Sequence, residues 1–195
     1  AHDAVAMARI AAGTSSVRVD VGWANDIAFL NVLGLGLETE VLQSMRQFRA
    51  FSGALVYVAA ALPVLRSYRG LRASIQYNGD APGPMQTWCA IVASNGPRFG
   101  GGFRVAPGAT VTDGRIDVVS VRDALPWRRL QLFVRARLGT HVDQPEVERR
   151  PVTDVRLRFE EAPLLDADGE LHAIGSRELR IRVHPGAIRV GTGDW

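Results

Sequence analysis

Two acidic turns hold the residues of this sequence that could do chemistry. They are Asp168-Gly169-Glu170 and Asp113-Gly114, the latter just before an apolar run at residues 116–121. Asp-Gly is a strong hairpin signal, so spacing alone favours a plain turn between strands at both places. A turn carboxylate could also accept a proton from a substrate hydroxyl. Phosphoryl transfer asks for little more than this, beyond positioning and neutralisation of phosphate charge.

The loop around Asp113 also has the donors that a hard cation uses. Its carboxylate, with main-chain oxygens of Thr110 and Arg115, would suit Mg²⁺ that keeps several waters. The spacing permits such a site without being diagnostic of one. Upstream lies a run of three glycines that lets the backbone approach a ligand or another strand, and a tight bulge is the favoured interpretation. These glycines are Gly100, Gly101 and Gly102.

The composition is that of a globular protein with a slight basic bias. The 195 residues are 47% hydrophobic and 22% charged, and all 23 Lys+Arg residues are arginines. The missing lysine excludes a P-loop lysine and a Schiff-base lysine within this sequence. A net charge of +3 is too small to indicate nucleic acid or anionic lipid by itself. The single cysteine, Cys89, cannot form an internal disulfide, which favours a reducing, cytoplasmic compartment.

No stretch has the features of a membrane span or a signal peptide. The most apolar run, residues 53–65, is too short and contains Pro63, whereas a spanning helix needs ~20 apolar residues. The first residues lack a basic segment followed by a long apolar core.

Hydrophobic periodicity predicts a mainly β, α+β protein. Helices are expected at residues 1–13, 38–49, 53–68 and 126–138. Strands are expected at residues 17–21, 27–33, 72–77, 85–94, 116–121, 155–159, 179–183 and 187–190. Several strands alternate outward arginines with apolar residues, which is typical of antiparallel sheets with one wet face. We therefore expect an elaborated antiparallel β-sandwich with two to four covering helices, and a mobile loop at residues 141–150.

The helix at residues 126–138 is basic and amphipathic. One side carries Trp127, Leu130, Val134 and Leu138, and the arginines toward the other side are Arg128, Arg129 and Arg135. A basic helix bearing a Trp can rest on an anionic membrane surface. The alternative, slightly favoured by the sequence, is a helix that covers one sheet and turns its arginines to solvent.

Taken in order, these motifs resemble the C-terminal domain of the diacylglycerol kinase and sphingosine kinase superfamily of lipid kinases. The resemblance covers nearly the whole sequence, and its most specific parts are residues 112–117 and Asp168-Gly169-Glu170. Its other segments are residues 10–13, 19–22, 29–38, 53–57, 94–96 and 100–107.

The resemblance implies a β-sandwich that holds an acceptor lipid and faces a nucleotide-binding domain across a cleft. Residues 1–20 would end that nucleotide-binding domain, and residues 21–195 would form the C-terminal domain. Glu170 would accept the proton of the lipid hydroxyl, and Asp168 would support Glu170 or the metal.

The resemblance also implies sites for ATP and Mg²⁺. Asn95, with the three glycines, would lie against the nucleotide, and Asp113 would bind a structural Mg²⁺ with main-chain oxygens of Thr110 and Arg115. The family's Gly-Gly-Asp-Gly-Thr phosphate loop does not occur in these 195 residues. We therefore expect the isolated chain to lack kinase activity.

The implied partners are a lipid (diacylglycerol, a sphingoid base or similar), the missing nucleotide-binding domain and a peripheral membrane surface. The sequence does not decide whether the protein forms a homodimer. Another interpretation is a non-catalytic lipid-binding or membrane-binding β-sandwich module. A nucleic-acid-binding barrel is disfavoured, because the arginines alternate along strands instead of interleaving with exposed aromatics.

Overall fold

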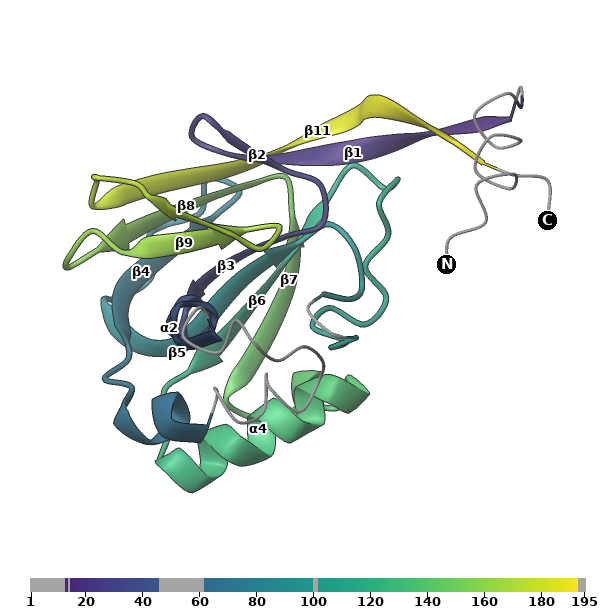
Figure 1. Ribbon diagram of the computed structural model, residues 1–195. Helices are drawn as coiled ribbons and strands as arrows, with labels where there is room; N and C mark the ends of the chain where they lie inside the picture. The colour runs from purple at the N-terminus through teal and green to yellow at the C-terminus, as the bar shows by residue number, and fades with distance from the viewer. Residues whose placement is uncertain (1–12, 14, 46–61, 100–101, 193–195) are drawn as a thin grey trace.

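The computed structural model describes residues 13, 15–45, 62–99 and 102–192, which form a curled antiparallel sheet with helices on one face (Figure 1). Eleven strands occur in these ranges: β1 Ser16–Ala24, β2 Ile27–Phe29, β3 Val32–Gly36, β4 Leu71–Tyr77, β5 Gln86–Ser94, β6 Ile116–Arg122, β7 Val147–Val152, β8 Asp154–Phe159, β9 Leu164–Ala167, β10 Glu170–Ala173 and β11 Glu178–Gly191. The helices are α2 Leu37–Met45, α4 Pro126–Leu138 and the 3₁₀ turn η2 His141–Asp143, and residues 62–67 add a helical segment.

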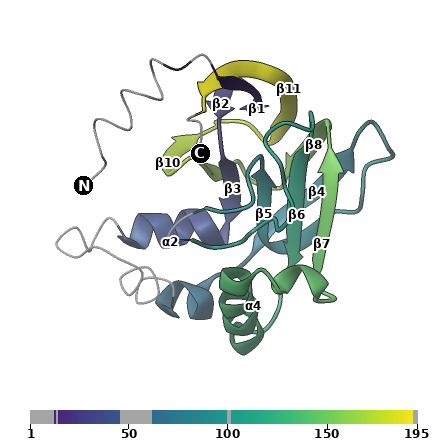
Figure 2. The same cartoon turned by 90° about the vertical axis from the view of Figure 1, so that its right-hand side faces the viewer.

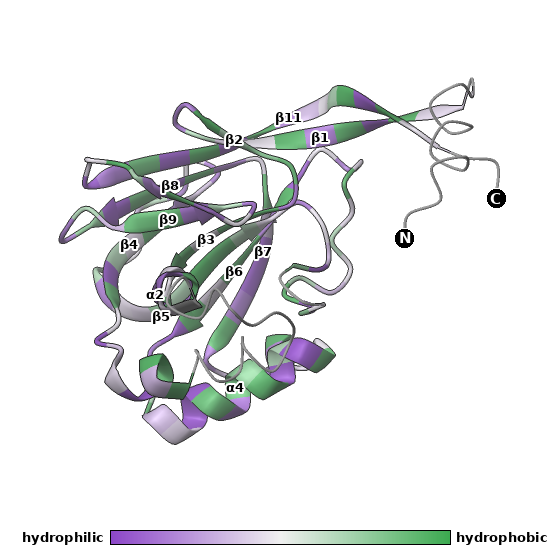
Figure 3. Cartoon of the chain, in the orientation of Figure 1, coloured by the Kyte–Doolittle hydropathy of each residue, from purple (hydrophilic) through white to green (hydrophobic). Residues whose placement is uncertain are grey.

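The sheet curls because strand β4 changes partners along its length. The strand order is β10-β9-β3-β5-β4-β8-β11-β1-β2, and β6 and β7 extend the sheet from β5. Residues 71–73 of β4 pair with β5, whereas residues 73–77 pair with β8. Apolar side chains from both parts then meet in one core, which includes Leu33, Ile91 and Leu157. The predicted mainly β, sandwich-like α+β fold is confirmed by these strands and their pairing. Figure 3 shows hydrophobic residues, in green, along the strands.

The strand expected at residues 27–33 is two strands, β2 and β3. The chain turns at Leu30 and Asn31, and the Asp168 carboxylate accepts backbone N–H groups from this turn. Strand β3 continues beyond the expected end at residue 33 and includes Gly34 and, as its last residue, Gly36. A Cβ on Gly34 would collide with the Glu38 carboxyl, so glycine lets α2 pack closely on the sheet.

The prediction of a mobile loop at residues 141–150 is wrong. Residues 141–143 form η2, and the polar stretch that follows enters strand β7. Among the described strands, β7 pairs with β6 alone, so it is an edge strand and tolerates Pro151. The two strands expected at residues 179–183 and 187–190 are one strand, β11, which pairs with β8 along its first part and with β1 along most of its length.

The helix expected at residues 126–138 is confirmed as α4. It has a proline in its first turn and ends at Gly139, whose φ of 81° gives a left-handed cap. Helix α2 and segment 62–67 confirm the described parts of two other expected helices; residues 1–12 and 46–61 lie outside the described residues. The proposed domain boundary at residue 20 falls inside β1 and stays a prediction.

Helices α2 and α4 and segment 62–67 cover one face of the sheet, where they pack on strands β5 and β6 (Figure 2). Their contacts form a second apolar cluster that includes Leu37, Val41, Leu65 and Cys89. Within the described ranges, no helix is both long enough and apolar enough to cross a membrane.

Candidate functional site

Asp168 and Gly169 form the tight turn of the β9–β10 hairpin. Asp168 has a φ of 51° and Gly169 a φ of 95°, so both residues adopt the left-handed conformation that a two-residue hairpin turn requires. The turn predicted from the sequence is confirmed. Strands β9 and β10 themselves were not predicted, because each has only four residues.

The Asp168 carboxylate fixes this hairpin against the turn between β2 and β3. Its Oδ1 accepts hydrogen bonds from the backbone N–H groups of Asn31 and Val32 at 2.9 and 2.8 Å. Its Oδ2 accepts one from Leu30 at 2.6 Å. The Asp168 N–H in turn donates to the Val32 carbonyl at 2.9 Å. Asp168 thereby sets the position of Glu170, two residues further along the chain.

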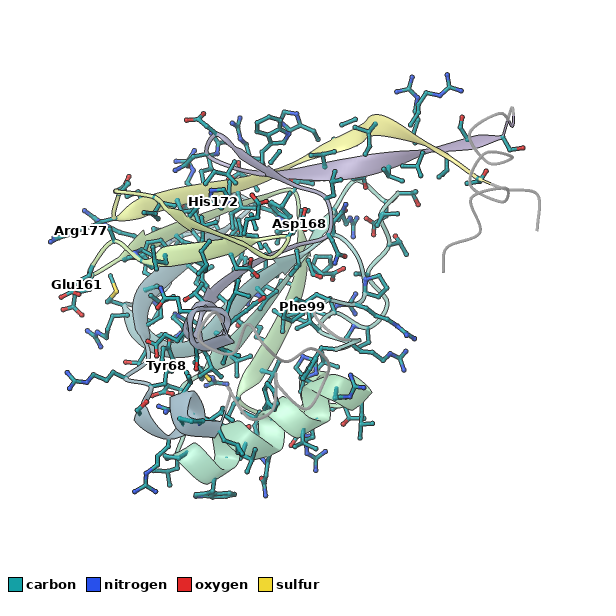
Figure 4. The ribbon with its side chains drawn as sticks, viewed as in Figure 1. Tyr68, Phe99, Glu161, Asp168, His172 and Arg177 are labelled. Atoms are coloured by element: carbon teal, nitrogen blue, oxygen red, sulfur yellow. The ribbon has the colours of Figure 1, made fainter. Side chains whose placement is uncertain are left out.

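Glu170 begins β10 and is exposed beside an open hollow. The hollow has a volume of about 440 Å³ and is lined by Asp26, Ile27, Ala28, Ala167, Asp168, Glu170 and His172. Figure 4 shows Asp168 and His172 together at this hairpin, farther from α4 than Tyr68 and Phe99 are in that view. An exposed carboxylate on a fixed turn can accept a proton from a hydroxyl that is delivered to the hollow.

A second pair of carboxyl groups, Glu38 and Asp166, lies buried next to the hairpin. Burial raises the pKa of Glu38 well above its usual range. Burial also raises the pKa of Asp166. Both Glu38 carboxyl oxygens are buried without a hydrogen-bond partner among the described residues, and Asp166 is the acidic neighbour that raises the Glu38 pKa beyond the effect of burial.

The Glu38–Asp166 pair is connected to the turn. Asp166 Oδ1 accepts a hydrogen bond from the Gly169 N–H at 2.8 Å. Sequence reasoning missed both residues of the pair. The available signal was an acidic residue inside the apolar run 164–167, since a carboxyl buried in a strand needs a partner.

An apolar cavity of about 100 Å³ lies between the helices and the sheet. Its walls are mainly apolar side chains of α2, α4, β5, β6 and the neighbouring loop, among them Val41, Val92, Phe99, Phe103, Leu132 and Phe133. Glu38 lies on the same wall. Glu38 therefore lines the cavity, and its neighbour Asp166 contacts the hairpin turn.

The other ionisable residues of the cavity are neutral or paired. Arg129 forms a two-pronged ion pair with Asp123, at 2.9 Å for each hydrogen bond, and also donates to the carbonyls of Leu65 and Tyr68. Burial lowers the pKa of His141, which favours a neutral imidazole. Burial also raises the pKa of the Cys89 thiol to about 12. The cavity is thus suited to an uncharged, apolar occupant.

The residues expected at the nucleotide lie in two different settings. Asn95 is 1% exposed. Its Nδ2 donates to the carbonyls of Asp20 and Leu30, both at 2.8 Å, so it joins β1 to the β2–β3 turn. Gly102 is exposed with a φ of 90°, whereas Gly100 and Gly101 lie outside the described residues. Contact of these residues with a nucleotide stays a prediction.

Asp113 lies on an exposed loop, where its Oδ1 accepts a hydrogen bond from the Arg115 N–H at 3.0 Å. The loop is anchored by Asp20, a buried carboxylate that accepts the N–H groups of Gly114 and Gly186, both at 2.7 Å. The sequence predicts a strand at residues 17–21 but gives no local sign of this anchoring role of Asp20.

Within the described ranges there is no group of three or more His, Cys, Asp or Glu residues that could hold a metal. A cation here would depend on Asp113 and on main-chain oxygens such as those of Thr110 and Arg115. One exposed carboxylate with carbonyl oxygens fits a hard cation that keeps several waters.

The model of the YegS C-terminal NAD kinase beta sandwich-like domain matches residues 31–192. The chain belongs to this family. The matched range of the YegS C-terminal domain contains α4, the Asp113 loop and the β9–β10 hairpin.

Similar proteins carry kinase names. The chain is 23% identical to a diacylglycerol kinase of Bacillus subtilis (strain 168) over 78% of this chain and 50% of that protein. It is 25% identical to a diacylglycerol kinase of Staphylococcus carnosus (strain TM300) over 80% of this chain and 50% of that protein. The chain thus spans about half the length of these relatives.

A solved structure has the same fold. The crystal structure of a diacylglycerol kinase from Bacillus anthracis str. Sterne superimposes with a TM-score of 0.62 at 14% identity, covering 95% of this chain and 57% of that one. The curled sheet and its covering helices therefore occur in a structure of very different sequence.

Proposed function

We propose that this YegS-type domain is the acceptor-lipid-binding and catalytic-base half of an ATP- and Mg²⁺-dependent lipid kinase. Its substrate is the hydroxyl of diacylglycerol or a related lipid. Glu170 accepts the hydroxyl proton as the phosphoryl group is transferred, and Asp168 holds the turn that presents Glu170. The observation that carries the proposal is the connection from the apolar cavity, through Glu38 and Asp166, to Gly169.

The cavity supports a lipid acceptor because its walls are apolar and its ionisable groups are neutral or paired. Each buried methylene contributes about 0.8 kcal/mol to binding. A cavity of about 100 Å³ takes only the end of an acyl chain, since a 150 Å³ cavity holds roughly one benzene.

ATP and its metal are the co-substrates in this proposal. The nucleotide is held by a separate nucleotide-binding half, with Asn95 and the glycines that include Gly102 facing it. A Mg²⁺ at Asp113 and the main-chain oxygens of Thr110 and Arg115 would stiffen the loop that Asp20 anchors. We propose that the isolated 195-residue chain is inactive and that the complete protein is cytoplasmic and peripherally associated with membrane.

Phosphorylation of dispersed dioctanoylglycerol by the complete protein tests this function. Glu170→Gln should lower kcat by roughly 10²–10⁴-fold, the usual contribution of a general base, with little change in KM. Glu161→Gln removes another exposed glutamate and is the matched control. Wild-type kcat in the Glu170 variant would refute Glu170 as the base. A complete protein that binds lipid without phosphorylating it would support the non-catalytic alternative.

A further inference from the structure

The outward face of α4 is apolar. Trp127, Leu130, Val134 and Leu138 recur at helical spacing, so they lie on one side of the helix. Their exposed fractions run from 37% at Leu130 to 63% at Leu138, and Leu125, just before the helix, is 65% exposed. We call these four helix residues the outer stripe. Exposed apolar residues that form one contiguous stripe mark an interaction surface, whereas scattered ones do not.

The same helix has a second, inward side that packs on the protein. Leu132 and Arg129 are buried, and Phe133 and Ala136 also line the cavity. The sequence favoured a helix that buries its apolar stripe and turns its arginines to solvent. In the structure the outer stripe instead faces solvent. Arg129 is buried and forms an ion pair with Asp123. Figure 3 shows strongly hydrophobic and hydrophilic residues interleaved along α4.

Charge beside the outer stripe is positive. Helix α4 contains four arginines and no acidic residue. Arg128 and Arg129 form ion pairs with Glu146 and Asp123, whereas Arg135 and Arg137 are exposed in the last turns of the helix. Segment 62–67 lies next to α4, because Arg129 donates to the Leu65 carbonyl. This segment and the residues after it add Leu62, 48% exposed, and the exposed Arg66 and Arg69.

We propose that the outer stripe, with its flanking arginines, is the surface by which the protein rests on an anionic lipid bilayer. Apolar side chains with a Trp enter the interface between headgroups and acyl chains, and arginines at the edge contact lipid phosphate. A second copy of the chain fits this surface less well, because a symmetric pair of α4 helices brings arginines against arginines.

This surface deepens the peripheral membrane association of the proposed function by naming the part of the protein that makes it. Docking itself does not depend on catalysis. The cavity lies directly behind α4, so the helix would separate the bilayer from the acceptor site by its own thickness. If the kinase proposal holds, a lipid reaches the cavity from the membrane around this helix.

Co-sedimentation of the complete protein with vesicles tests the surface. We expect the protein to sediment with phosphatidylcholine vesicles that contain phosphatidylglycerol, and weakly with phosphatidylcholine alone. The variant Leu130→Gln/Val134→Gln/Leu138→Gln should bind the anionic vesicles at least about tenfold more weakly, because three side chains lose interfacial burial. Arg135→Gln/Arg137→Gln should reduce binding less and mainly at low salt.

The matched control is Val17→Gln/Ile188→Gln/Val190→Gln, which removes exposed apolar residues from the β1–β11 ribbon, far from α4 (Figure 1). It should bind vesicles as the wild type does. Equal binding by the outer-stripe variant, or equal loss in the ribbon variant, overturns the proposal. So does an outer-stripe variant that turns a wild-type dimer into a monomer on size-exclusion chromatography, since the stripe would then be a subunit interface.

Thermal unfolding of each variant separates docking from folding, since exposed substitutions should change stability by only about 0.5 kcal/mol. If the wild type phosphorylates no lipid in any form, the kinase proposal fails, and vesicle binding still reports on the outer stripe. If it is active, the outer-stripe variant should lose more activity on vesicle-embedded than on dispersed diacylglycerol.

Discussion

Two glutamates near the β9–β10 hairpin, Glu38 on α2 and Glu170 on β10, lie in opposite environments. Glu38 is 8% exposed and borders the apolar cavity behind α4, and burial raises its pKa well above the usual range. Glu170 is exposed beside an open hollow on the same hairpin. Both connect to the turn, Glu38 through Asp166 and Glu170 directly. The difference shows how burial divides two identical side chains into one that already holds a proton and one that is accessible to a substrate.

The largest expected effect on stability contrasts the two sides of α4. Leu132→Ala removes a side chain that is 5% exposed and enlarges the cavity. We expect the free energy of unfolding to fall by about 2–5 kcal/mol. Leu130→Ala, on the outer stripe of the same helix, should change it by about 0.5 kcal/mol or less. Denaturant titration measures both, and equal losses would show that the outer stripe is packed against protein.

The next effect tests the hairpin that presents Glu170. Asp168→Ala leaves three backbone N–H groups without their acceptor. We expect a loss of about 2 kcal/mol in stability and a fall in kcat of the complete protein. Asp113→Ala, at the other Asp-Gly turn, removes a local hydrogen bond from the Arg115 N–H and serves as the control for stability. A fall no larger than in this control would show that Asp168 does not order the turn.

A smaller effect concerns the buried pair and depends on pH. The folded-state pKa of Glu38 is raised above its unfolded value, so the folded state binds this proton more tightly. The resulting stabilisation is complete below about pH 4 and is lost as pH rises toward the folded-state pKa. Glu38→Gln keeps a neutral donor at this position without that loss. Its unfolding temperature relative to wild type should therefore rise from pH 4 to pH 8, whereas the control Glu161→Gln should show no such trend.

The smallest effect uses the single cysteine as a probe of the cavity. The pKa of Cys89 is raised to about 12 by burial. Its thiolate fraction is thus very low, and it should react with a thiol reagent at pH 8 far more slowly than in urea. A bound acceptor lipid should slow the reaction further, because Cys89 lines the cavity. Fast modification of the native protein, unaffected by lipid, would indicate that the cavity is open to solvent and does not hold the chain.

Much of the fold could be predicted from the sequence, because local signals were strong. Helix α4 begins with a proline and ends at a glycine, and its bounds match the prediction. Most strands were predicted from alternation, as at residues 116–121 and 155–159. Strand β7 was missed because it contains arginines and a proline and is stabilised by its pairing with β6.

The site was less predictable, because its burial is set by residues far apart in the sequence. Glu38 and Asp166 are separated by 128 positions, and nothing local to either one shows that they meet. The predicted orientation of α4 was wrong for a related reason. A helix with apolar residues on two sides has no single apolar face, so periodicity alone could not show which side the sheet covers.

In the proposed function, Glu170, and not Glu38, accepts the substrate proton. The most direct measurement compares kcat for Glu170→Gln and Glu38→Gln in the complete protein, with saturating ATP and dispersed diacylglycerol. We predict a loss of roughly 10²–10⁴-fold for Glu170→Gln and a loss below about tenfold for Glu38→Gln. Unchanged kcat in the Glu170 variant, or an equal loss in the Glu38 variant, would contradict this assignment.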